Sequence, residues 1–71
     1  MKEKSEILEE FGRKVQRCRE RLGISQEKLA ERANVHRTYI GTVERGETNI
    51  TLINLHKIAD ALNVGVEQLI K

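Results

Sequence analysis

The chain of 71 residues is long enough for one small domain with a limited core, and it contains no proline that would interrupt a helix. Aromatic residues make up only 3%, and β-branched residues do not alternate with polar ones, so we predict a single all-α domain over residues 1–71. The net charge of +2 is unevenly spread: residues 11–45 carry nine Lys and Arg against four Glu, whereas residues 1–10 and 46–71 are net acidic. The basic segment favours an anionic partner, nucleic acid first, although a merely soluble charged surface would show the same pattern.

The sequence gives no sign of a disulfide, a metal site, a catalytic site or a membrane-spanning segment. The single cysteine, Cys18, excludes an intramolecular disulfide, and we interpret it as a small buried hydrophobe. His36 and His56 lie twenty positions apart without a Cys or carboxylate at ligand spacing, so no metal site is expected. We find no nucleophile and base pair and no glycine-rich phosphate loop, and we expect no cleft of useful size, no enzyme and no cofactor. No secretory signal or membrane-spanning apolar run is present, so the protein is expected to be cytoplasmic.

The first predicted helix follows a short frayed segment, residues 1–4, and ends before Gly23. Ser5 is the expected N-cap, because a short hydroxyl side chain can accept a hydrogen bond from the first turn. Gly12 inside this helix costs about 1 kcal/mol relative to alanine, which a close contact with another helix would explain. One apolar stripe recurs at helical spacing: Ile7, Leu8, Phe11, Val15, Cys18 and Leu22.

Two short helices follow, over residues 26–33 and about 36–45. Ser25 is a good N-cap for the first of them, and Gly46 ends the second. Between them stands Asn34, one of the few residues besides glycine that tolerates the left-handed conformation of a tight turn. Such a turn makes the two helices cross steeply, so the outer face of the second helix should project from the body.

Positions 37, 41 and 45 are four apart, as are 38 and 42, so these five residues share one face of the helix, opposite the apolar Ile40 and Val43. They are Arg37, Thr38, Gly41, Thr42 and Arg45. An α-helix with such a face fits the major groove of DNA. Arg37 can donate two hydrogen bonds to the O6 and N7 edge of guanine, and the hydroxyls of Thr38 and Thr42 can bond to base edges. Gly41 would let a backbone approach closely. A polar face that is simply solvated is the alternative.

Other residues of the same unit are placed to contact phosphates. Gln26 lies in the first turn of its helix, where free N–H groups and the helix dipole favour an anion. Arg45 is long enough to reach a phosphate, and His36 begins the third helix near the expected path of the DNA backbone.

A fourth helix is predicted over residues 52–62, capped by Thr51, and a last short helix over 66–70. The buried stripe of the fourth helix is expected to consist of Leu52, Leu55, Ile58, Ala59 and Leu62. Ile53, Val66 and Ile70 have no evident place in so small a core, so they are candidates for a dimer contact. Scattered exposed apolar residues are the alternative interpretation.

Taken together, these motifs resemble the lambda-repressor-like (XRE-type) helix-turn-helix regulators. The resemblance covers roughly residues 7–70, with GISQEKLA at 23–30, VERG at 43–46 and KIADALNV at 57–64. It implies a five-helix domain that binds a two-fold symmetric DNA operator as a homodimer. It places base reading on Arg37, Thr38 and Thr42, and backbone contact on Gln26 and the loop around Asn49.

Within that family, HRTYI at 36–40 and TNITL at 48–52 look like the controller proteins of restriction–modification systems. The resemblance implies operator contacts by Arg37, Thr38 and Tyr39, of which we assign Tyr39 to the DNA backbone. Thr48 departs from the family, because controller proteins often carry a basic residue there. The resemblance also implies a structural ion pair between Arg19 and Glu44, which the positions of both residues at the edges of their apolar stripes support independently.

The expected function is therefore that of a transcriptional regulator, with RNA polymerase as a further candidate partner and no membrane involvement. Three alternatives stay open: a phage-type repressor, an antitoxin that regulates its own operon, and a module that binds another protein instead of DNA. Specific DNA binding and the neighbouring genes would separate them.

Overall fold

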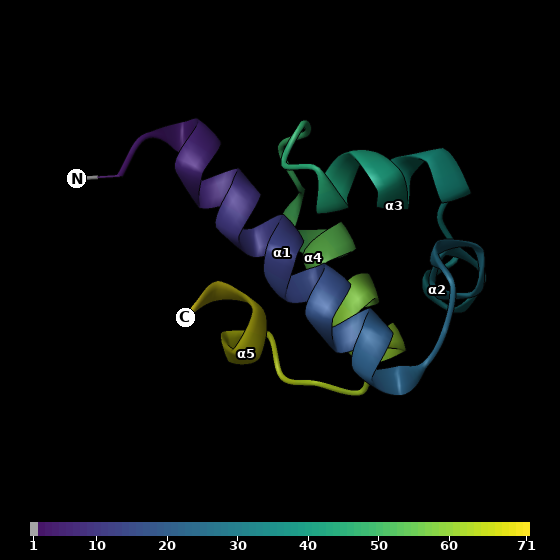
Figure 1. The fold of residues 1–71 in the computed structure, drawn as a ribbon. Helices are drawn as coiled ribbons and strands as arrows, with labels where there is room; N and C mark the ends of the chain where they lie inside the picture. The colour runs from purple at the N-terminus through teal and green to yellow at the C-terminus, as the bar shows by residue number, and fades with distance from the viewer. Residues whose placement is uncertain (1) are drawn as a thin grey trace.

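The computed structural model describes residues 2–71, and Met1 lies outside the described part. Five helices and no strand are found among these residues, as the sequence predicts (Figure 1). In chain order they are α1 (Lys4–Leu22), α2 (Gln26–Ala33), α3 (Arg37–Glu44), α4 (Leu52–Ala61) and α5 (Glu67–Ile70).

The start of α1 differs from the prediction. The N-cap is Glu3 rather than Ser5, and Lys4, which was expected to fray, is already helical. Glu3 can cap the helix because its backbone N–H donates a hydrogen bond to Oε1 of Glu6 at 3.4 Å, as in a capping box. The other end agrees with the sequence: Gly23 adopts a left-handed conformation with φ 70° directly after the helix.

The predicted caps of α2 and α4 are present. The hydroxyl oxygen of Ser25 accepts from the backbone N–H of Lys28 at 3.0 Å, and that of Thr51 accepts from Asn54 at 3.1 Å. Asn34 has φ 56°, the left-handed conformation expected of the turn between α2 and α3. These local hydrogen bonds set the bounds of the helices before any packing is considered.

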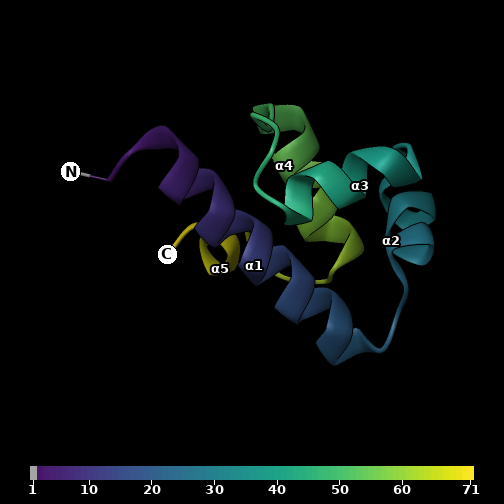
Figure 2. The same ribbon diagram turned by 45° about the horizontal axis from the view of Figure 1, so that its top comes forward.

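The turn after Asn34 leads directly into α3, which is one residue shorter at each end than predicted. His36 is its N-cap, because the ring nitrogen Nδ1 accepts from the backbone N–H of Thr38 at 3.1 Å. Arg45 is its C-cap, and Gly46 follows with φ 73°. In Figures 1 and 2, α2 lies beside the start of α3, and α3 runs along one side of the molecule.

All five helices contribute to one core. Its largest fully buried side chains are Leu29, Ile40, Ile58, Leu62, Leu69, Val15 and Val43. Gly12 of α1 is buried against α3, where an added Cβ would overlap the carbonyl oxygens of Val43 and Glu44. The close helix contact that would explain this glycine is therefore present, and it brings α1 directly onto the C-terminal turn of α3.

Some members of the predicted apolar stripes are not buried. Ile7 and Leu22, near the two ends of α1, are exposed, and Cys18 is half-buried rather than buried. Leu52 was predicted to face the core, but it is 69% exposed in the first turn of α4. Helical periodicity identifies the side of a helix that faces the core, whereas only the tertiary structure shows where the core ends along that helix.

The C-terminal part returns to α1. α4 ends at Ala61 with Leu62 as its C-cap, and Asn63 leaves it with φ 59°. α5 then packs against α1, with Leu69 fully buried, so the C-terminus lies on the same side of the molecule as the start of α1 (Figure 1).

Candidate nucleic-acid interface

The α2–α3 unit presents one polar face to the outside. Ile40 and Val43 hold α3 on the core, while Arg37 and Thr38 on the opposite side are exposed and Thr42 is half-buried. A helix packed on one side and polar on the other can enter the major groove without losing its own packing.

The predicted base-reading residues differ in how free their side chains are. Nη1 of Arg37 donates to Oε2 of Glu27 over 3.5 Å, so the guanidinium is turned toward the start of α2. The hydroxyl of Thr42 donates to the carbonyl oxygen of Tyr39 at 2.8 Å, which leaves its oxygen free to accept and its methyl group to pack. Thr38 is exposed at the N-terminal turn of α3.

Gly41, which was predicted to lie open at the centre of the outer face, is buried, and a side chain of the same protein lies next to it. An added Cβ would meet the guanidinium of Arg45, whose Nη1 would be 3.1 Å away. Arg45 thus lies across the glycine, and its Nε also forms an ion pair with Oε2 of Glu47 at 3.1 Å.

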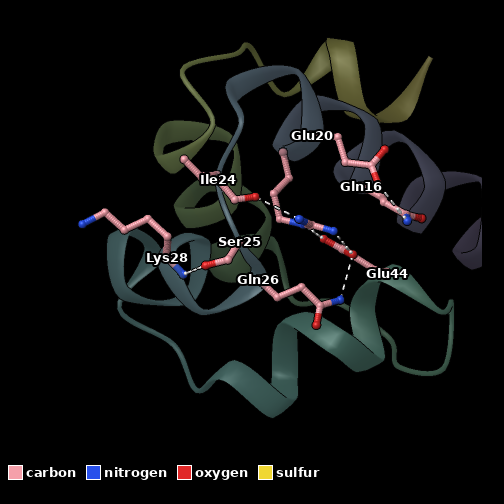
Figure 3. A network of polar contacts seen from close by, with 8 residues as sticks. Gln16, Glu20, Ile24, Ser25, Gln26, Lys28 and Glu44 are labelled. Carbon is pink, nitrogen blue, oxygen red and sulfur yellow. Dashed lines mark hydrogen bonds and ion pairs between the residues drawn. The ribbon is translucent and has the colours of Figure 1, made fainter.

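A buried polar network ties α1, α2 and α3 together (Figure 3). Arg19 donates from Nε to Oε2 of Glu44 at 2.6 Å and from Nη2 to Oε1 at 3.1 Å. Its third nitrogen, Nη1, donates to the carbonyl oxygen of Ile24 at 2.9 Å. Glu44 is only 7% exposed, and the hydrogen bond to it raises the pKa of Arg19 above its ordinary value. The guanidinium and the carboxylate meet as a two-point fork, a strong ion-pair geometry.

Gln26 belongs to the same network. Its amide Nε2 donates to Oε1 of Glu44 at 2.9 Å, a contact that the sequence did not suggest. Gln26, which was predicted to contact a phosphate, is therefore held in place by a hydrogen bond to Glu44, the partner of Arg19. Beside it, a surface hollow of about 390 Å³ is lined by Arg19, Ser25, Gln26, Glu27 and Arg37.

Tyr39 is half-buried against the core, and its phenolic oxygen accepts from Nδ2 of Asn54 at 3.1 Å. Asn54 is a residue that sequence reasoning missed, because nothing in its local pattern marks it as the partner of an aromatic residue on another helix.

His36 is exposed at the start of α3. Asn49 is exposed in the loop after α3, beside the half-buried Thr48.

The three candidate dimer residues differ in how exposed they are. Ile53 on α4 is 72% exposed and Ile70 on α5 is also exposed, whereas Val66 is half-buried against the core. A groove of about 380 Å³ lies between α1, α4 and α5, where the sequence led us to expect no cleft of useful size. Its lining is mainly apolar and includes Ile7, Leu8, Phe11 and Ile70.

Residues 2–71 contain no group of three or more His, Cys, Asp or Glu side chains that could hold a metal ion. Within the same range, no helix has both the length and the apolar character needed to span a bilayer.

Comparison with known proteins assigns the chain to a family. The model of the family described as Helix-turn-helix matches residues 15–69, which include α2, α3 and α4 entirely. The chain belongs to this helix-turn-helix family, and its five helices have the lambda-repressor-like arrangement.

Within the family, the chain is similar to control proteins. It is 46% identical to the control protein C.BamHI of Bacillus amyloliquefaciens, over 84% of this chain and 75% of the relative. It is also 46% identical to the control protein C.SmaI of Serratia marcescens, over 92% and 77%. The crystal structure of the restriction-modification controller protein C.AhdI from Aeromonas hydrophila superposes with a TM-score of 0.86 at 40% identity, covering 87% of this chain and 94% of that one.

Proposed function

We propose that this protein is a sequence-specific regulator of transcription that binds double-stranded DNA and controls a restriction–modification operon. The observation that carries the proposal is the α2–α3 unit, in which a buried ion pair holds a helix whose outer face is polar and accessible. Similarity to control proteins over at least 84% of the chain supports the narrower assignment. In this proposal residues 1–71 act as one DNA-binding domain in the cytoplasm, without catalysis.

The proposed binding mode uses two copies of the chain. Each copy inserts α3 into the major groove, and the two grooves lie about 34 Å apart on a two-fold symmetric operator. The apolar groove bordered by Ile70 and the exposed Ile53 are the apolar surfaces proposed for such a homodimer, and Val66, half-buried against the core, is the third candidate contact. RNA polymerase is a further proposed partner, which a regulator bound upstream of a promoter would contact.

The proposed roles follow the geometry of the α2–α3 unit. In this proposal Arg37, Thr38 and Thr42 read base edges from α3, and Arg37 makes the bidentate guanine contact. The phosphates are contacted by residues around the rim of that face: Gln26, His36, Tyr39, Arg45 and Asn49. Glu44 of α3 accepts a hydrogen bond from Gln26 of α2. The network that holds α3 in place therefore also holds the side chain proposed to contact a phosphate.

Two substitutions test this division of roles after a bound duplex has been selected from a random pool. Arg37→Ala should lower the ratio of operator to random-DNA affinity by about 5- to 150-fold per subunit, which corresponds to about 1–3 kcal/mol for each bidentate base contact. Gln26→Ala should weaken binding to both duplexes by similar factors. Circular dichroism should first show that both variants are folded. If Arg37→Ala retains full discrimination, α3 is not the reading helix.

The rival functions predict other results. A module that only binds another protein would show no preference among duplexes, so specific binding by the purified chain excludes it. A methyltransferase and an endonuclease gene beside this one would support a controller, whereas a toxin gene would support an antitoxin. The chain is also 32% identical to the immunity repressor protein of Bacillus phage phi105, over 83% of this chain but only 41% of that repressor.

A further inference from the structure

The proposed base reader Arg37 has an acidic neighbour on the other helix of the unit. Nη1 of Arg37 lies 3.5 Å from Oε2 of Glu27, which stands in the first turn of α2. Both side chains are exposed, at 69% and 74%. Glu27 also lines the hollow that contains Gln26, so a carboxylate occupies the edge of the place where a DNA phosphate is expected.

Neither of the two simple roles of a surface glutamate accounts for this position. An exposed ion pair at 3.5 Å adds little to stability. A negative charge in the first turn suits the helix dipole, but that effect does not require a partner on α3. For a domain that binds DNA, a carboxylate at the phosphate edge of the interface opposes binding. Its presence needs a benefit that appears only in the complex with the correct sequence.

We propose that Glu27 is a specificity-determining residue, which holds the guanidinium of Arg37 toward base edges and penalises its use on phosphates. The inference rests on the proposed function. A guanidinium has five N–H donors in a planar fork, and the contact with Glu27 uses Nη1. The opposite edge, Nε and Nη2, can then donate to O6 and N7 of a guanine while the contact with Glu27 persists.

Random DNA offers Arg37 no matching guanine at this position. The guanidinium then turns to a phosphate, the contact with Glu27 is lost, and the carboxylate is left beside the phosphate backbone. Removing the charge of Glu27 should therefore favour the random complex and leave the operator complex unchanged or weaker. The effect on the ratio of affinities, rather than on affinity itself, is the signature of the proposed role.

The chain supplies two matched comparisons. Glu47 pairs with Arg45 at the other end of α3, with Nε to Oε2 at 3.1 Å, but Arg45 is proposed to contact phosphate on any sequence. Glu47→Gln should therefore tighten both complexes by similar factors. Glu31 is an exposed residue of α2 whose partner is Lys28 on the same helix, so Glu31→Gln is a control for the loss of one negative charge.

The experiment measures the dissociation constants of the wild type and of Glu27→Gln, Glu47→Gln and Glu31→Gln. Each is titrated with the selected operator and with a scrambled duplex of the same length and composition, at three salt concentrations. For Glu27→Gln we expect scrambled-duplex binding to tighten by about 1.5- to 5-fold per subunit, the range for an exposed pair. Operator binding should not tighten, so the ratio of affinities falls. The ratio for Glu31→Gln should equal that of the wild type.

A second measurement separates a role through Arg37 from general repulsion. In the Arg37→Ala background, Glu27→Gln should no longer change the ratio, because the group that it orients is gone. The proposal is overturned if Glu27→Gln shifts both duplexes equally, or if the ratio changes just as much without Arg37. A wild-type chain that binds operator and scrambled duplex alike would overturn both the proposed function and this inference. A discriminating wild type with an unchanged Glu27→Gln ratio overturns the inference alone.

Discussion

Glu44→Ala should be among the most destabilising single substitutions in this protein. The side chain of Glu44 is 4% exposed and that of its partner Arg19 is 13% exposed. Three hydrogen bonds converge on the carboxylate, two from Arg19 and one from Gln26. Truncation removes all three and leaves a guanidinium largely out of water with only the carbonyl oxygen of Ile24 as acceptor.

The expected size follows from that burial. Breaking a buried pair by removing one partner costs about 3–5 kcal/mol, and the remaining solvent access of Arg19 favours the lower end. A domain of this size has a free energy of unfolding of about 4–11 kcal/mol, so the loss is a large fraction of it. With a urea m-value of about 1 kcal/mol per molar, the midpoint should fall by about 3 M.

The assay is urea unfolding followed by circular dichroism at one fixed protein concentration, so that any self-association affects all samples equally. Glu31→Ala is the matched control, because Glu31 is an exposed residue of α2 whose ion pair with Lys28 on the same helix is also exposed. It should change the free energy of unfolding by less than about 0.5 kcal/mol. An unchanged midpoint for Glu44→Ala would show that the pair does not hold α3 and would remove the basis of the proposed interface.

Three further outcomes are expected. Gly12→Ala should lower the free energy of unfolding in the same urea assay by about 1–3 kcal/mol despite alanine's better helix propensity, because its Cβ overlaps two carbonyl oxygens of α3. An unchanged midpoint would contradict the close contact. Ile70→Glu should weaken self-association in sedimentation velocity more than Ile53→Glu does, because Ile70 borders the apolar groove; equal association of both variants and the wild type would exclude this face. The hydrogen bond from Lys2 lowers the pKa of Glu10 from its ordinary value of 4.5. The contribution of Glu10 to stability should be present above about pH 4.5 and disappear as the pH falls through the lowered pKa. Acid unfolding of Glu10→Gln should lack that component.

The local rules of helix formation account for what the sequence predicted well. Ser25 and Thr51 are N-caps, and Gly23 and Asn34 adopt the left-handed conformation, because each of these features depends on a side chain and a few backbone groups nearby. Where the prediction failed, at the start of α1, the competing cap was Glu3 with Glu6, a second local solution that also satisfies the first turn.

Residues whose roles depend on where the core ends were harder to predict. Leu52 and Ile7 belong to apolar stripes by spacing, yet both are exposed: Leu52 lies in the first turn of α4, and Ile7 lines the groove between α1, α4 and α5. Gly12 could be recognised only as a position that needed an explanation. The explanation is the approach of α3, which no pattern within α1 contains.

The sequence by itself determined five helices, the N-caps of α2 and α4 and the polar face of α3, because periodicity and capping act over a few residues along the chain. Apart from the Arg19–Glu44 pair, which the sequence predicted, only the tertiary structure decided which side chains share a hydrogen bond across helices. It joined Gln26 to Glu44 and Asn54 to Tyr39, and it set Glu27 against Arg37. The physical reason is that such contacts depend on the relative heights and rotations of packed helices. Shifts of about one ångström in packing make or break them, whereas helical spacing is unaffected.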